Sequence, residues 1–219
     1  MHSIAMQISG WSFLAAALML WLGWALLPVK LGTFFVPDDF VRIHPVLYRW
    51  IWLFRVHLFG YVVTMMALVA LGSTIEGALA RAVFWPAIAV AAAGLIVGAL
   101  AQAFYYHFGA WGAIEMHGKD EQARQKLVDS LHVSTHYVTC LVRFGRVFFG
   151  LGLLVLAAGV YQSGLLPGWV GISAAALGFA AMALTMGLPD HLEFFQPVFH
   201  LIAAWLAATG VLLLFLSGT

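Results

Sequence analysis

Histidines are the side chains of this sequence best suited to chemistry, because an imidazole can bind a metal ion, transfer a proton or accept a hydrogen bond. The chain has nine, and three of them stand within or at the end of long apolar stretches. His57 follows Arg55 by two residues, His200 lies about one turn into the last apolar stretch, and His107 ends the third. An ionisable side chain inside a membrane span predicts a functional site when it faces other helices rather than lipid.

A second pattern is the pair His132 and His136, four residues apart in a stretch rich in helix formers. This spacing places both imidazoles on one face of a helix, where two histidines can bind one metal ion. Asp129, Cys140 and Arg143 continue the same polar stripe. No glutamate follows His132, so the metallopeptidase motif is absent, and a solvated helix face is the alternative interpretation.

The composition is that of an integral membrane protein. Of 219 residues 63% are hydrophobic and 9% are charged, and the mean hydropathy is +0.98, whereas soluble domains are about a quarter charged. The net charge of +1 gives no indication of nucleic-acid binding. The single cysteine, Cys140, excludes an internal disulfide and any multi-cysteine zinc or iron–sulfur site.

The hydropathy pattern predicts an all-α, single-domain bundle of six transmembrane helices, each about 20 apolar residues long. The expected spans are residues 11–29, 47–72, 83–106, 143–161, 168–187 and 198–216. Residues 120–142 contain no glycine or proline, and we expect them to form a helical extension that continues directly into the fourth span. Gly94 and Gly98 are spaced for a close contact between helices.

Six spans place both termini on one side of the membrane. Nine of the ten Lys and Arg residues, and eight of the nine histidines, then fall on the other side. Because Lys and Arg of short loops collect on the cytoplasmic side, we expect non-cytoplasmic termini and a histidine-rich cytoplasmic face. The histidines of that face are His44, His57, His107, His117, His132, His136, His191 and His200.

Two neighbouring motifs carry a family resemblance. They are Phe148–Leu154, which reads FFGLGLL, and Tyr161–Gly171, which reads YQSGLLPGWVG. Residues 143–209 resemble the C-terminal half of a bacterial six-helix membrane family catalogued only as a domain of unknown function. Gln162 stands where that family often has arginine, and Gly168 where it has arginine or lysine. The resemblance implies a six-helix bundle in a bacterial cytoplasmic membrane, and it implies no activity.

The leading functional prediction is a redox cofactor, haem b, bound near the cytoplasmic face by two imidazoles from different helices, since neutral imidazole suits iron. The candidate ligands are His57, His107, His136 and His200. Arginines of the same face would pair with the haem propionates. They are Arg55, Arg143 and Arg146. Such a protein would transfer electrons or serve as the membrane subunit of a respiratory-type complex.

Two alternatives remain open at this point. A non-haem metal enzyme could use His132 and His136, although the chain has only one HxxxH pair and no adjacent histidines. A protein without a cofactor could instead use the polar face to bind a lipid headgroup or a quinone, or could act as an accessory subunit. The expected partners are the lipid bilayer and further membrane subunits or copies of this chain. The sequence does not decide whether the protein is an enzyme.

Overall fold

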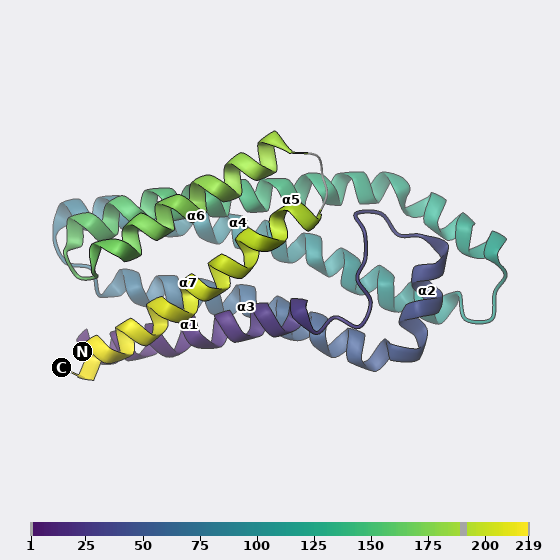
Figure 1. Ribbon diagram of the computed structural model, residues 1–219, viewed down its shortest axis with the longest axis horizontal. Coiled ribbons are helices and arrows are strands. Elements are labelled where there is room, and N and C mark those ends of the chain that lie inside the picture. Colours follow the sequence, from purple (N-terminus) through teal and green to yellow (C-terminus); the bar gives the residue numbers. More distant parts are fainter. Residues whose placement is uncertain (1, 189–191, 219) are drawn as a thin grey trace.

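The computed structural model describes residues 2–188 and 192–218, and all regular structure in these ranges is helical (Figure 1). The helices are α1 (His2–Ala25), α2 (Pro37–Ile43), the short 3-10 helix η1 (His44–Val46), α3 (Leu47–Ser73), α4 (Ala78–Glu115), α5 (Glu121–Ser163), α6 (Gly168–Gly187) and α7 (Leu192–Gly218). Six helical segments are long and apolar enough to cross a membrane. The predictions of an all-α fold and of six such segments are confirmed. His191 lies outside the described residues.

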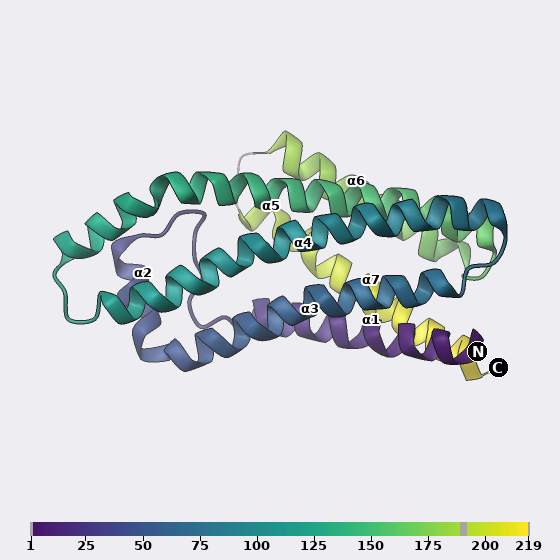
Figure 2. The ribbon, with the colours of Figure 1, turned by 180° about the vertical axis from the view of Figure 1, so that it is seen from behind.

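The bundle is elongated, and its two ends differ (Figures 1 and 2). Both termini lie at one end, where the Ser3 hydroxyl donates a hydrogen bond of 2.9 Å to the carbonyl oxygen of Ser217. We call this the terminal end. The opposite end consists of α2 together with the adjoining parts of α3, α4 and α5, and we call it the α2 end.

The first apolar helix is displaced from its predicted position at residues 11–29. It begins at His2 and ends at Ala25, three residues before Pro28. Proline has no backbone N–H and restricts the residue before it, so it marks the end of this helix.

The short helix α2 follows in a stretch for which no element was predicted. Pro37 is at its first turn, where its missing N–H costs nothing. The Asp39 carboxylate accepts a 2.9 Å hydrogen bond from the backbone N–H of Val36, which secures the start of the helix.

Helices α4 and α5 form the long axis of the molecule. They have 38 and 43 residues, which at the usual rise is roughly 57 and 65 Å, compared with about 30 Å for a hydrocarbon core. Helix α4 continues to Glu115, beyond the predicted boundary at residue 106. Helix α5 is unbroken from Glu121, so the extension and the fourth apolar segment are one helix. Both helices therefore project well past α1, α6 and α7 at the α2 end (Figure 2).

Two apolar cores follow one another along this axis. The first, around Phe13, Phe84 and Leu153, is formed by the six long helices together. The second, around Phe40 and Trp50, lies at the α2 end. There α2 and the loop before it cover the extended parts of α3, α4 and α5. This second core was not predicted, because its residues were assigned to loops and helix ends.

Glycines set the closest helix contacts. A Cβ added at Gly94 would overlap the backbone of Phe149 and Gly145, and one at Gly145 would lie 3.0 Å from the backbone nitrogen of Gly98. Helices α4 and α5 therefore meet backbone to backbone, which is the close contact that the spacing of Gly94 and Gly98 predicts. The contact fixes α4 and α5 relative to each other beside a cavity that both helices line.

Candidate ligand-binding cavity

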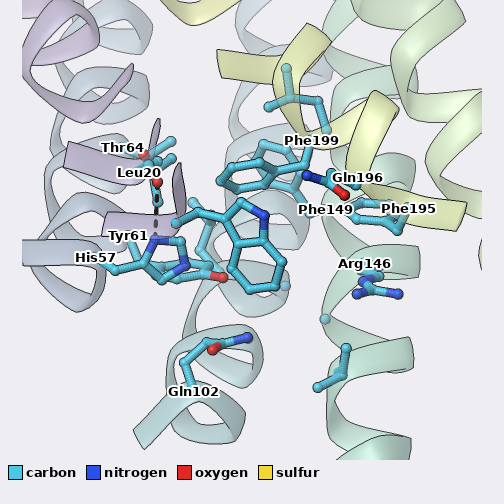
Figure 3. Close-up of a pocket in the computed structure, with 17 residues that line it drawn as sticks. Leu20, His57, Tyr61, Thr64, Gln102, Arg146, Phe149, Phe195, Gln196 and Phe199 are labelled. Carbon is cyan, nitrogen blue, oxygen red and sulfur yellow. Dashed lines mark hydrogen bonds between the residues drawn. The ribbon is translucent and has the colours of Figure 1, made fainter. Parts of the chain in front are cut away.

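A cavity lies between α1, α3, α4, α5 and α7 (Figure 3). Its empty space is about 860 Å³, part of it open to the outside. Apolar and aromatic side chains form most of its wall, and a small number of polar side chains project into it. The polar lining residues are His57, Tyr61, Thr64, Gln102, Arg146 and Gln196.

His57 is the buried polar group at the centre of one wall, with 3% of its surface exposed. Its Nδ1 lies 3.1 Å from the carbonyl oxygen of Leu20. A carbonyl oxygen can only accept a hydrogen bond, so Nδ1 carries the proton and Nε2 of the neutral ring is an acceptor. In Figure 3 one ring nitrogen is bonded to Leu20 and the other lies on the cavity side. The Leu20 carbonyl thus holds the ring through Nδ1, and the acceptor nitrogen Nε2 faces the cavity.

Two glycines allow α1 to reach His57. A Cβ added at Gly23 would lie 2.5 Å from Cβ of His57, and one at Gly60 would lie 2.9 Å from the side chain of Leu20. Because neither glycine has a side chain, α1 and α3 pack at short distance. This approach brings the Leu20 carbonyl within hydrogen-bonding distance of the imidazole.

Aromatic rings from three helices surround the imidazole. The ring centroid of Tyr61 lies 5.3 Å from that of His57, edge on at 86°. Trp24 of α1 and Phe199 of α7 lie 6.3 and 6.0 Å from His57, and 6.0 Å from each other. These rings give the cavity flat apolar walls beside the acceptor nitrogen of His57.

Polar groups on other helices face the same space. Gln102 comes from α4 and Gln196 from α7 (Figure 3). Within the described ranges neither amide makes a side-chain hydrogen bond to another residue. Arg146 of α5 places its guanidinium 4.1 Å from the ring centroid of Phe195, a cation–π contact. The two amides and the guanidinium supply hydrogen-bond donors to the cavity.

A second cavity, with about 750 Å³ of empty space, adjoins the first and shares Trp24, Gln102 and Gln196 with it. It extends to the loop after α1, where Lys30 is part of its wall. Tyr105 also lines it and donates a 2.8 Å hydrogen bond to the carbonyl oxygen of Thr33, which holds this loop against α4. The space around His57 therefore continues toward the α2 end.

Two of the seven residues predicted to bind a cofactor, His57 and Arg146, line the first cavity. The others have different surroundings. The Arg55 side chain donates to the Tyr106 hydroxyl at 3.2 Å, and Arg143 donates to the carbonyl oxygen of Thr185 at 2.8 Å.

The other predicted histidine ligands do not line this cavity. His107 is exposed on α4. His200 is partly buried on α7, and its Nδ1 has no hydrogen-bond partner among the described residues. His136 is exposed on the part of α5 that projects toward the α2 end. A haem with two imidazole ligands requires a second histidine across the same space, so this geometry gives more support to a ligand held by one imidazole.

The predicted metal pair does come together. Nε2 of His132 and Nε2 of His136 are 3.2 Å apart on the exposed face of α5. In the described part of the chain, no group of three or more His, Cys, Asp or Glu side chains is placed to hold a metal ion.

Several lining residues were missed at the sequence level. Gln102 and Gln196 are uncharged amides at the edges of apolar stretches, and a polar residue in such a position is a signal that could have identified them. Trp24 and Tyr61 carry no such signal, because aromatic residues are common throughout these helices.

Comparison of the chain with protein-family models, curated proteins and solved structures finds no match in any of the three. The resemblance of residues 143–209 to a bacterial membrane family thus stays a prediction.

Proposed function

We propose that this protein is an integral membrane protein that binds a quinol in the cavity around His57. The observation that supports this most directly is the buried imidazole, whose Nδ1 is fixed by the Leu20 carbonyl and whose Nε2 accepts. A quinol hydroxyl is a suitable donor to that nitrogen. The oxygen at the other side of the quinol ring can accept from the amide of Gln102 or Gln196.

The walls suit the rest of such a molecule. Trp24 and Phe199 present aromatic rings to a flat head group, and ring-on-ring contacts favour that shape. Leu95 and Ile202 extend the wall with aliphatic side chains, against which an isoprenoid tail would pack. A largely apolar pocket with a few convergent polar groups is typical of small-molecule sites.

The location fits a molecule dissolved in the bilayer. In this proposal the six long helices cross a bacterial cytoplasmic membrane with both termini outside, because basic residues gather at the α2 end. They include Lys30, Arg42, Arg49, Lys119 and Arg124. The quinol site then lies in the cytoplasmic half of the membrane. The chain would act as the quinol-binding membrane subunit of a respiratory-type complex, with the quinol in place of the predicted haem b.

Solvent extraction of protein purified from membranes tests this proposal. Chromatography of the extract is expected to yield quinone near one molecule per chain, and a His107→Leu variant is expected to retain it. An extract that contains phospholipid but no quinone would contradict the proposal and favour a lipid site. A reduced-minus-oxidised visible spectrum of the same sample tests the haem b prediction independently, because a haem gives a Soret band and a quinone does not.

A further inference from the structure

His132 and His136 form a close pair on α5, outside the cavity around His57. Nε2 of His132 and Nε2 of His136 lie 3.2 Å apart, with the two rings almost perpendicular at 87°. The ring centroids are 4.7 Å apart, farther than the nitrogens, so the two Nε2 atoms are turned toward each other. Both side chains are exposed, so an ion in solution can reach them.

The separation of the two nitrogens is compatible with a single ion bound to both. Two nitrogens bound to Zn²⁺ at about 2.05 Å and separated by a tetrahedral angle lie about 3.3 Å apart, whereas a right angle would place them about 2.9 Å apart. The observed 3.2 Å is close to the tetrahedral value. Zn²⁺ is the metal ion that most often takes nitrogen ligands in a tetrahedral arrangement.

A phenyl ring limits the motion of both imidazoles, and one carboxylate lies a turn away along the helix. Phe34, from the loop between α1 and α2, stacks on His132 at 5.4 Å and 27° and meets His136 edge on at 4.9 Å. Asp129, one turn before His132, adds a carboxylate on the same side of the helix. The Asp129 carboxylate is itself oriented by a 2.7 Å hydrogen bond from the amide of Gln125.

We propose that His132 and His136 form an open zinc site on the projecting part of α5, separate from the cavity around His57. The two imidazoles supply two ligands through Nε2, and water fills the remaining tetrahedral positions. Zinc held in this way links two successive turns of α5 beneath Phe34. It therefore stabilises the projecting helix where the α1–α2 loop crosses it.

The chain contains a matched control in a second close pair of histidines. His44 and His117 stack face to face, with ring centroids 3.7 Å apart and planes 9° from parallel. The lone pair of an unprotonated ring nitrogen lies in the ring plane, so stacked parallel rings direct theirs side by side and not at one point. This pair brings two exposed or half-exposed imidazoles together without a chelating geometry.

Calorimetric titration of tag-free protein with Zn²⁺ tests the site. We expect one zinc per chain, and His132→Ala or His136→Ala is expected to weaken binding by more than the roughly 10–100-fold that loss of a residue supporting a ligand costs. The control His44→Ala/His117→Ala should bind zinc as the unmodified protein does. Co²⁺ in place of Zn²⁺ should give the visible absorption of a tetrahedral ion, and this absorption should disappear in His136→Ala.

Zinc binding that survives both single substitutions, or that falls equally in the control, would overturn the assignment. No zinc binding at all would mean that the 3.2 Å contact is only a hydrogen bond between the two rings. Both results are independent of the quinol proposal, because His132→Ala and His136→Ala should leave quinone extraction unchanged.

Discussion

The carbonyl oxygen of Leu20 lies 3.1 Å from Nδ1 of His57 and so links α1 to α3 at the wall of the cavity. This bond fixes both the position and the tautomer of the imidazole, because a carbonyl can only accept. The contact depends on Gly23 and Gly60, whose missing side chains let the two helices approach. The tautomer leaves Nε2 free to accept a hydrogen bond from a quinol, and the two glycines keep α1 close enough to hold the ring.

Gly23→Ala is expected to destabilise the bundle and weaken ligand binding together. The added methyl would lie 2.5 Å from Cβ of His57, so α1 and α3 must separate. Overpacking of this kind costs about 1–3 kcal/mol. Thermal unfolding in detergent measures the first effect and a quinol titration the second. Gly168→Ala is the control, since its added methyl would meet nothing within 4 Å beyond its chain neighbours and its own helix backbone. Equal behaviour of the two variants would refute the close contact.

Gly94→Ala tests the crossing of α4 and α5. Its new methyl would overlap the backbone of Phe149 and Gly145, and helix backbones cannot yield as a flexible side chain can. We expect a loss of about 1–3 kcal/mol in the free energy of unfolding, measured against the same Gly168→Ala control. An unchanged midpoint of thermal unfolding would show that these helices are farther apart than described.

Gln102→Leu and Gln196→Leu should reduce affinity without reducing stability. Neither amide makes a side-chain hydrogen bond within the described residues, so its replacement breaks no internal bond. Loss of one hydrogen bond to the ligand corresponds to about a tenfold loss of affinity. Gln122→Leu, exposed on α5 outside the cavity, is the control. If both cavity variants bind quinol as the control does, the ligand does not contact these amides.

The expected orientation can be read with cysteine labels, because Cys140 is the only cysteine of the chain. In a Cys140→Ser background, Ser3→Cys should react with a membrane-impermeant maleimide added to intact spheroplasts. Ser130→Cys, exposed on the projecting part of α5, should react only after the membrane is opened. The reverse labelling pattern would place the termini in the cytoplasm.

Hydropathy predicted the helical class and the six long segments, because the length of an apolar stretch depends only on nearby residues. Helix α6 (Gly168–Gly187) coincides with its predicted range. The ends of α1 and α4 differed, since helix ends depend on local breakers such as Pro28 and on tertiary contacts. The second core was missed for a related reason. Phe40 lies in a stretch that was assigned to a loop and Trp50 near a helix end, and only their packing against α4 shows that they form a core.

The cavity was predictable only in part. His57 was identified as an ionisable residue in an apolar stretch, and Arg146 as one of three arginines expected to pair with haem propionates. Which residues converge depends on helix rotation and crossing, so sequence could not separate His57 from His107 or His200. The pair His132 and His136 was predictable because both residues belong to one helix, where spacing alone fixes their proximity.

The most direct test of the central proposal is the affinity of a short-chain quinol for His57→Asn, measured by calorimetry beside the unmodified protein and His107→Leu. The asparagine amide nitrogen can take the place of Nδ1 and donate to the Leu20 carbonyl, which preserves the α1–α3 link. No acceptor remains at the position of Nε2, because the asparagine oxygen ends about where the ring carbon Cδ2 lies. We predict that His57→Asn loses about tenfold or more in affinity, with the thermal midpoint and the His107→Leu affinity unchanged. Equal quinol affinities for His57→Asn and the unmodified protein would contradict the proposal that His57 holds the ligand.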